Sequence, residues 1–330
     1  MKIQPVKGTR DFYPPQMRLR NYIADAWRRV SLRNGFEEYD APIFEYLDLF
    51  TVKSGQEIAE QLFSFTDRGG RNLAIRPEIT PSLARMVNAK INSLPRPIKW
   101  FSIPRLCRAE RPQRGRLREF FQWNVDIIGP DDVLADAECI FTAVDFLREV
   151  GLTSKDVTIR YSSRDLLGEV LTNFGVPDRD MEKVMAVLDK RSKVPEEAFE
   201  EMLTQAVPGE GRMGILRFLN MKEIGASPPA SIAQNVGMKS SQVVVEAIGA
   251  LQDFQKHLDA LQIGDWCRYD PGIVRGLAYY TGIVYEVFAE GESLRAIAGG
   301  GRYDNLLEVL GGPKIGATGF GMGDVVLGIL

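Results

Sequence analysis

The segment from Arg105 to Arg118 concentrates positive charge in a short stretch of chain. It holds six arginines, at positions 105, 108, 111, 114, 116 and 118. Guanidinium groups at this density repel one another unless anions lie among them. Because a guanidinium binds phosphate oxygens in pairs, Arg108 and Arg116 could grip different phosphates of one triphosphate. The pattern alone fits a solvated hairpin face or an RNA-backbone patch equally well.

Acidic and amide side chains accompany these arginines. Glu110 lies in the same segment, and Gln122 and Asp126 are an even number of residues apart, so a strand would direct both to one face. The apolar residues around them predict partial burial, where Asp126 would need a cationic partner. The segment therefore predicts the floor of a polar pocket, with an exposed sheet face as the alternative.

Glu78 lies just before an expected helix start at Thr80 and Pro81. A carboxylate there either receives the ammonium group of a ligand, with Thr80 beside it, or stabilises the helix electrostatically as a cap. Taken alone, the position favours capping over ligand binding.

Two later segments also carry polar chemistry. Arg275 is followed by Gly276 and by Tyr279 and Tyr280, which together offer a cation, close backbone access and phenolic donors. An ordinary turn between strands is the alternative. The segment AGGGRYD at 298–304 would let the backbone approach a flat ligand, but it lacks the glycine spacing of dinucleotide and P-loop sites.

The composition excludes several kinds of site. A net charge of -3 argues against a uniformly basic surface that coats nucleic acid. His257 is the only histidine and is expected on a polar helix face, so multi-histidine metal sites are excluded. Cys107, Cys139 and Cys267 are too widely spaced for a zinc site or a disulfide framework, and no protein-bound metal is predicted. The chain shows no signal-peptide pattern and no membrane-spanning run, which predicts a cytoplasmic protein with no membrane contact.

The elements that position these residues follow from periodicity. A helix is predicted over 15–34 and ended by Gly35, followed by a strand over 36–46 broken at Pro42. Further predictions are a strand over 73–76, a helix from 80 to about 92 with Thr80 as N-cap and Pro81 as first helical residue, and a long hairpin over 98–128.

The second half of the chain contains a long helical segment between strands. A helix is predicted over 135–150 and a strand over 156–161. A helical pattern then runs from 163 to about 250. Strands return at 267–270, 283–289 and 294–298. This order predicts an α+β fold with a mainly antiparallel sheet. We expect two core segments, 1–170 and 251–330, separated by a helical insertion at 171–250.

Taken together, these segments resemble class II aminoacyl-tRNA synthetases, and the histidyl-tRNA synthetase family in particular, along essentially the whole chain. KGTRDFYPP at 7–15 is similar to that family's N-terminal signature, and residues 35–42 to the first class motif, which forms the dimer interface. CRAERPQRGRLREFFQ at 107–122 looks like the second class motif, and 274–282 and 298–304 look like two histidyl-specific motifs. The resemblance implies a homodimer and an antiparallel sheet flanked by helices.

The resemblance also implies roles for individual residues. Arg108 would bind the α-phosphate of ATP, Glu110 the adenine side and Arg116 the terminal phosphate, with Phe120, Gly301 and Gly323 completing the ATP site. For histidine, Glu78, Thr80 and Gln122 would take the α-ammonium group. The remaining histidine-pocket residues implied are Asp126 close by, Arg275 at the carboxylate and α-phosphate, Tyr280 at the imidazole, and Tyr279 and Gly299 beside them.

The chain departs from the family pattern at two places. Ala278 stands where many members read RGLDYY, and Gly323 is followed by Asp324, Val325 and Val326 where many end in Gly-x-Glu-Arg. The usual ATP-binding arginine is therefore missing at this point. A branch of the family combines RGLAYYTG with a GFGxGD ending. The chain also stops at Leu330, where a full synthetase continues into an anticodon-binding domain, so it would be a truncated form or a free-standing paralogue.

The function implied is activation of L-histidine with Mg-ATP to histidyl-adenylate and its transfer to the 3′ end of tRNA(His). Catalysis would consist of positioning and charge stabilisation by Arg108, Arg275 and Mg²⁺, without a protein nucleophile. One alternative is a regulatory subunit of ATP phosphoribosyltransferase, which binds histidine without making adenylate and which the chain length favours. Another is a tRNA-binding or structural paralogue with an inactive site. The retained arginines, glutamate and tyrosine pair favour the enzyme.

Overall fold

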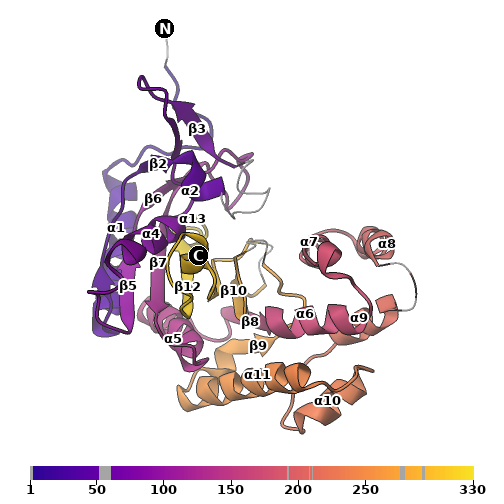
Figure 1. The fold of residues 1–330 in the computed structure, drawn as a ribbon. Coiled ribbons are helices and arrows are strands. Elements are labelled where there is room, and N and C mark those ends of the chain that lie inside the picture. Colours follow the sequence, from indigo (N-terminus) through magenta and orange to yellow (C-terminus); the bar gives the residue numbers. More distant parts are fainter. Residues whose placement is uncertain are drawn as a thin grey trace.

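A mainly antiparallel sheet forms the centre of the computed structural model, which describes residues 3–51, 61–191, 193–207, 209, 211–275, 279–291 and 294–330 (Figure 1). Its strands are β1 (Glu37–Glu38), β5 (Ile98–Ser102), β6 (Arg105–Cys107), β7 (Glu119–Ile128), β8 (Val157–Ser163), β9 (Cys267–Tyr269), β10 (Ile283–Ala289), β11 (Ala298–Arg302) and β12 (Ala317–Gly323). They run in the order β1-β5-β7-β12-β11-β10-β8-β9, with β6 paired to β7. The β1–β5 and β8–β9 pairs are parallel and the others antiparallel, so the predicted α+β fold is confirmed.

The N-terminal elements pack on one end of this sheet. Helix α1 (Pro14–Arg33) ends at Asn34, and Gly35 follows with a φ of 79°, a conformation that favours glycine. The predicted amphipathic helix is confirmed, because Trp27 of its buried face stacks on Trp123 of β7 with ring centroids 6.1 Å apart.

A small second sheet lies above the hairpin. It consists of β2 (Phe44–Tyr46), β4 (Asn72–Ile75) and β3 (Phe63–Thr66), in that order, next to helix α2 (Leu47–Thr51). Helix α4 (Thr80–Lys90) follows β4, and its N-cap is Ile79. The prediction of Thr80 as N-cap was therefore wrong by one residue: Thr80 is the first helical residue, Pro81 the second, and the threonine side chain is buried rather than capping the helix.

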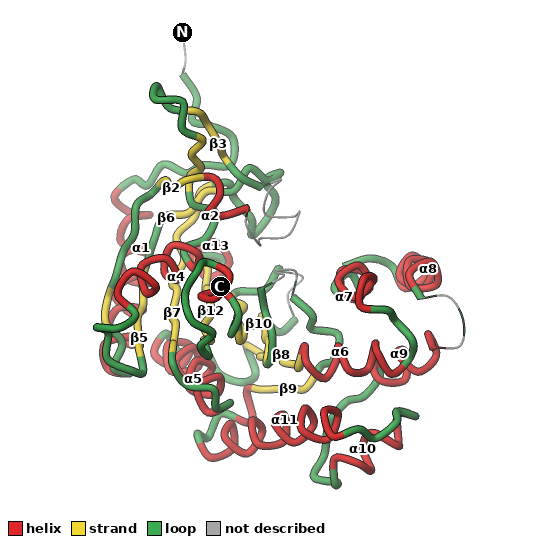
Figure 2. The backbone as a smooth tube through the Cα atoms, in the orientation of Figure 1, coloured by secondary structure: helices red, strands yellow, loops and turns green. Residues whose placement is uncertain are grey.

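Helices occupy most of the chain between β8 and β9. These helices are α6 (Arg164–Asn173), α7 (Met181–Leu188), α8 (Glu196–Ala206), α9 (Gly211–Leu219), α10 (Pro229–Asn235) and α11 (Gln242–Ala260). They confirm the helical pattern predicted from 163 onward. Figures 1 and 2 show α7 and α8 on the side of the molecule away from the N-terminal elements, while α11 lies beneath β8 and β9.

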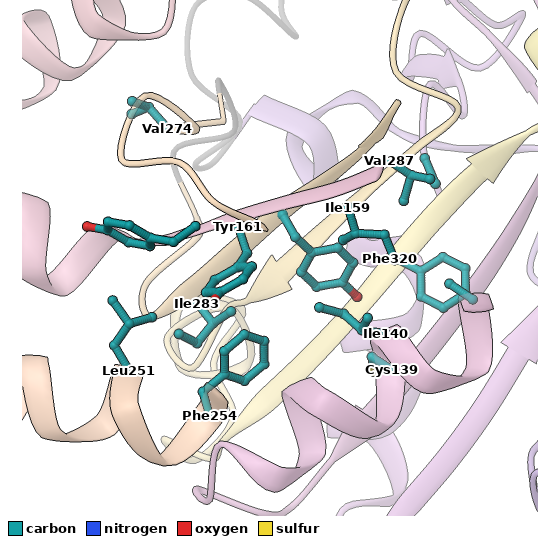
Figure 3. Close-up of a cluster of buried hydrophobic side chains, with 14 of the residues drawn as sticks. Cys139, Ile140, Ile159, Tyr161, Leu251, Phe254, Val274, Ile283, Val287 and Phe320 are labelled. Carbon is teal, nitrogen blue, oxygen red and sulfur yellow. The ribbon is translucent and has the colours of Figure 1, made fainter. Parts of the chain in front are cut away.

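The main hydrophobic core includes the contacts of the sheet with two helices, α11 and α5 (Leu134–Glu149), and extends to α1 and to the helices of the α6–α10 segment. Tyr161 of β8 meets Phe254 of α11 edge to face, with ring centroids 5.1 Å apart. Figure 3 shows this cluster with side chains from β8, β10, β12 and both helices, including Ile159, Ile283, Val287, Phe320, Cys139, Ile140 and Leu251. One face of the sheet is thus closed by apolar packing, which holds the strands in place for the other face.

The glycine-rich segment near the C-terminus is a central strand rather than a loop. The strand predicted over 294–298 was wrong, because β11 begins only at Ala298 and is built from the glycines themselves. A Cβ at Gly300 would lie 2.6 Å from Cβ of Phe320 and 2.8 Å from the ring of Tyr285. Crowding between β10 and β12 therefore requires glycine in this strand, although glycine ordinarily disfavours strands.

Candidate active site

A cavity of about 600 Å³ opens above the face of the sheet that the core leaves free. Its lining comes from β7, β10, β11, β12, the arginine-rich hairpin and the region around α4. The structure brings together all the predicted site residues here except Glu110 and Gly301, namely Glu78, Thr80, Arg108, Arg116, Phe120, Gln122, Asp126, Arg275, Tyr279, Tyr280, Gly299 and Gly323. A single concave site with charged and aromatic walls is the usual form of a small-molecule site.

Strand β7 supplies the floor by strict alternation. Gln122 and Asp126 line the cavity, as predicted from their even spacing, and Asn124 between them lines it too. Trp123 and Val125 point to the opposite face and are fully buried in the core. One strand therefore holds the cavity's polar floor rigidly against the main core.

Asp126 has a different partner from the one expected. The predicted cationic partner is wrong: the Tyr303 hydroxyl donates a hydrogen bond of 2.6 Å to Asp126 Oδ1, and Oδ2 has no hydrogen-bond partner among the described residues. Burial raises the pKa of Asp126 to about 7, while the Tyr303 bond opposes that rise and the charge of Glu78 adds to it. The floor thus carries a carboxyl group ready to accept a proton or an N–H donor.

Glu78 is the second buried carboxylate. The Tyr279 hydroxyl donates to its Oε2 at 2.7 Å, and its Oε1 has no hydrogen-bond partner in the described structure. Burial raises the pKa of Glu78, and the charges of Arg108 and Arg275 oppose that rise. Its side chain faces the cavity, so a role limited to capping α4 does not account for its position.

Arg275 is held in a demanding conformation. Its φ is 63°, which a residue with a side chain adopts only at a cost of roughly 1 to 3 kcal/mol. Its Nη1 donates to Glu286 at 2.6 Å, and its guanidinium lies 5.6 Å from the centre of the Tyr280 ring. Gly276 and Ala278, which the sequence also singled out, lie outside the described residues. Strain of this kind is typical of functional positions.

The glycines of β11 and β12 make room for the polar side chains. A Cβ at Gly299 would overlap the guanidinium of Arg275, one at Gly321 would come within 2.6 Å of the Gln122 amide, and one at Gly319 would overlap Asp126. These glycines therefore accommodate neighbouring site residues, and close approach of the 298–304 backbone to a flat ligand stays a prediction. Gly301 is within β11 outside the cavity lining, where a Cβ would lie 2.6 Å from the Ile283 carbonyl.

The six arginines of the hairpin have separate tasks. Of these six, only Arg108 and Arg116 line the cavity, so the prediction that several arginines converge on phosphate is now limited to these two. Arg108 donates from Nε to the Pro77 carbonyl at 3.0 Å and lies 5.2 Å from the centre of the Phe120 ring. Arg116 forms an ion pair with Glu110, which is how Glu110 joins the site from outside the lining. Of the remaining arginines, Arg105 forms an ion pair with Glu119. Arg118 donates to backbone carbonyls, and Arg111 and Arg114 are exposed.

The cavity wall that contains Val326 is apolar and adjoins the hairpin, because a Cβ at Gly115 would lie 3.4 Å from Cγ2 of Val326. Gly323, Val325 and Val326 line it, where helix α13 (Asp324–Leu327) begins. The neighbouring Asp324 has a structural task, because its Oδ1 accepts from the Phe121 backbone N–H at 2.9 Å and its Oδ2 pairs with Arg10 at 2.6 Å. Asp324, in the C-terminal segment that departs from the family pattern, thus links Arg10 of the N-terminal signature to Phe121 of the hairpin.

Several lining residues were missed in the sequence. Asn124 could have been found from its place between Gln122 and Asp126, and Glu286 from its charge within an apolar strand. Tyr303 was part of a recognised motif without a role. The other missed charged residues of the lining are Asp189, Lys193 and Arg295, for which the sequence pattern carried no signal.

Other predicted absences can be compared with the described residues. No group of three metal-ligating side chains occurs within them. His257 lies on α11 with 34% of its side chain exposed, 3.9 Å from Asp132. Cys107, Cys139 and Cys267 are free thiols. None of the described helices combines the length and hydrophobicity that a bilayer crossing requires.

Comparison with known proteins identifies relatives of this chain. A histidine–tRNA ligase from Opitutus terrae is 43% identical over 329 residues, which cover 99% of this chain and 74% of that protein. The chloroplastic/mitochondrial histidine–tRNA ligase of Arabidopsis thaliana is 42% identical over 326 residues, covering 98% of this chain and 65% of that protein. The chain thus spans about two thirds to three quarters of the length of these relatives.

Solved structures share the fold. Histidyl-tRNA synthetase from Nostoc superposes with a TM-score of 0.84 at 22% identity, covering 100% of this chain and 75% of that one. A Bacillus halodurans protein described as an ATP phosphoribosyltransferase regulatory subunit/histidyl-tRNA synthetase also gives 0.84, at 20% identity, covering 99% and 82%. The model of the family described as histidyl-tRNA synthetase matches residues 8–323, and the chain therefore belongs to that family.

Proposed function

We propose that this protein activates L-histidine with ATP to histidyl-adenylate and transfers the histidyl group to the 3′ end of tRNA(His). The observation that carries the proposal is the polarity of the cavity. Two buried carboxyl groups, on Glu78 and Asp126, each have one oxygen without a hydrogen-bond partner among the described residues, and they lie in the same cavity as Arg108, Arg116 and Arg275. Relatives named histidine–tRNA ligase at 38 to 43% identity support the same reaction.

The acceptor groups suit an amino acid with two nitrogen centres. Glu78, with Thr80 and Gln122, would take the α-ammonium group, and the unpaired oxygen of Asp126 would accept an N–H of the imidazole beside Tyr280. A buried acceptor without a partner costs free energy until a ligand supplies the donor. That cost makes the pocket selective, because a side chain without an N–H at this depth would leave Asp126 unsatisfied. Gly299 would give the ligand room beside Arg275.

The cationic groups suit the triphosphate. Arg108 would hold the α-phosphate between the Phe120 ring and the histidine, and Arg116 would hold the terminal phosphate. The histidine carboxylate would attack the α-phosphorus, the bond to the leaving pyrophosphate would break, and the resulting adenylate would then pass its histidyl group to the tRNA. Arg275, fixed by Glu286, would neutralise the carboxylate and the developing charge, so that catalysis rests on positioning and electrostatics.

The remaining ATP contacts are proposed at Glu110, Gly301 and Gly323. Mg²⁺ would neutralise phosphate charge during the reaction. Since Mg²⁺ is usually held by substrate phosphates and only one or two carboxylates, a site without a dedicated protein cage fits its use. Arg108 and Arg116 would orient the phosphates that carry it.

Histidine-dependent exchange of pyrophosphate into ATP tests the proposal. The purified chain should exchange label only when histidine is present, and Arg275→Ala should abolish the exchange. Arg268 is an exposed arginine of β9 outside the cavity, so Arg268→Ala should exchange normally. Histidine binding without exchange would instead identify the non-catalytic regulatory paralogue. The 20% identity of the match that bears a regulatory-subunit description supports only the fold. A folded chain that neither binds histidine nor exchanges would be the inactive structural paralogue.

Three further properties are proposed with this function. A homodimer is supported by large apolar side chains exposed on the N-terminal elements, such as Leu19, Tyr22, Phe44 and Tyr46, and sedimentation would test it. The division into 1–170, 171–250 and 251–330 is also proposed; because both boundaries fall within helices, α6 and α11, limited proteolysis should cut in the loops between these helices. A cytoplasmic location is supported by the three free thiols, and cell fractionation would test it.

A further inference from the structure

Most cations in the cavity lining already have a partner. Lys193 pairs with Asp189 at 2.5 Å and Arg275 with Glu286 at 2.6 Å, while Arg116 pairs with Glu110. Arg108 is bonded to the Pro77 carbonyl. Arg295 differs, because no ion pair or hydrogen bond of its side chain occurs within the described part of the chain, and the residue is exposed at the cavity. Its guanidinium is thus available to a ligand.

The backbone brings the segment that contains Arg295 close to the apolar wall. The Gly323 N–H donates to the Ile297 carbonyl at 3.1 Å, and Ala298 pairs with Met322 in the β11–β12 register. The segment leading into β11 therefore runs beside the start of α13, whose Val325 and Val326 face the same cavity. An apolar wall offers a phosphate group no partner, and Arg295 brings an exposed guanidinium to the same cavity.

We propose that Arg295 binds the polyphosphate of ATP on the side of the cavity formed by Gly323, Val325 and Val326. This inference rests on the proposed use of ATP at this site. Arg108 and Arg116 approach from the hairpin, and Arg295 approaches from the segment that leads into β11. An arginine suits this task because its planar fork binds two phosphate oxygens at once and its long side chain reaches past small apolar neighbours.

The test compares Arg295→Ala with Arg295→Lys and with Arg268→Ala as the matched control. Arg268 is exposed on β9, outside the cavity lining, and likewise has no ion pair among the described residues. In histidine-dependent pyrophosphate exchange, Arg295→Ala should raise the KM for ATP roughly ten- to hundredfold, the range typical of one charge-assisted hydrogen bond. The KM for histidine should stay within about twofold, and Arg295→Lys should recover part of the loss because it keeps the charge.

Direct binding separates this inference from the proposed reaction. Calorimetry with Mg-ATP and with AMP needs no catalysis, so it decides the role of Arg295 even if the wild-type chain shows no exchange. The expected result is weaker ATP binding by Arg295→Ala with unchanged AMP binding. Equal loss for AMP would overturn the assignment to polyphosphate, and ATP binding equal to that of Arg268→Ala would overturn the inference altogether.

Discussion

Replacement of Asp126 by asparagine should stabilise the ligand-free protein at neutral and alkaline pH. The substitution keeps the shape of the side chain and an oxygen that accepts the Tyr303 hydrogen bond, but it removes the charge. In the wild-type chain that charge lies fully buried beside Glu78 with one oxygen unpaired. The asparagine variant avoids the free-energy cost of ionising a carboxyl group there.

The size and the pH range of the effect follow from the pKa. Burial raises the pKa of Asp126 from its ordinary value of 3.8 to about 7. Because the folded state binds this proton more tightly than the unfolded state, the wild-type chain has the associated stability below about pH 4 and loses it as the pH rises to about 7. At about 1.36 kcal/mol per pKa unit, the loss amounts to about 4 kcal/mol. The free energy of unfolding of Asp126→Asn relative to wild type should therefore rise through this range and level off above it.

Urea unfolding of both chains without ligand, between about pH 5 and pH 8.5, measures this difference. Asp25→Asn is a suitable control, since the side chain of Asp25 is 62% exposed and removal of a surface charge changes stability by only about 0.5 kcal/mol or less. Stability curves of Asp126→Asn and wild type that stay parallel across the range would refute the reasoning. In the exchange assay the same variant should lose affinity for histidine, because the amide offers a weaker acceptor at the imidazole.

Three further predictions concern neighbouring groups. Tyr303→Phe removes the hydrogen bond that lowers the pKa of Asp126, so the pH range of its stability loss should move upward in the same urea experiment. Gly299→Ala should reduce exchange about 100-fold by displacing the Arg275 guanidinium, whereas Gly249→Ala, with open space at its Cβ, should exchange normally. Arg302→Met leaves the fully buried Asp136 without the cation that lies 2.6 Å away, and it should lower the free energy of unfolding by about 3 to 5 kcal/mol. The double variant Arg302→Met/Asp136→Leu should recover part of this loss. Recovery of none of it would contradict the pairing.

The sequence predicts those parts of the site that lie within one element. The period of two along β7 placed Gln122 and Asp126 together, and the apolar residues between them predicted the buried face correctly. The amphipathic pattern of α1 and the hairpin were likewise readable, because each is a local consequence of side-chain spacing. The strand at β11 was misplaced, since glycine carries no strand propensity and only its packed neighbours explain it.

Hydrogen bonds between side chains far apart in the sequence could not be predicted from residue spacing. The Tyr303 hydroxyl reaches Asp126 across 177 residues and the Tyr279 hydroxyl reaches Glu78 across 201. No spacing rule extends over such separations, so the partner predicted for Asp126 was a cation where the fold supplies a phenol. The family resemblance gathered most of the same residues, but it offered no role for Arg295 because that arginine belongs to no motif identified in the sequence.

The two faces of the sheet explain how the folded protein accommodates groups in the site that are unfavourable for the free energy of folding. The cavity face holds Arg275 at a positive φ and two buried carboxyl groups, each with one oxygen that no described residue bonds. On the core face of β7, Trp123 packs edge to face on Phe320 at 5.0 Å and donates to the Ser31 hydroxyl at 2.8 Å. Because neighbouring residues of one strand serve the two faces, the packing that offsets the unfavourable groups also fixes their positions. A ligand that supplies the missing donors and anions therefore meets a site that is already organised.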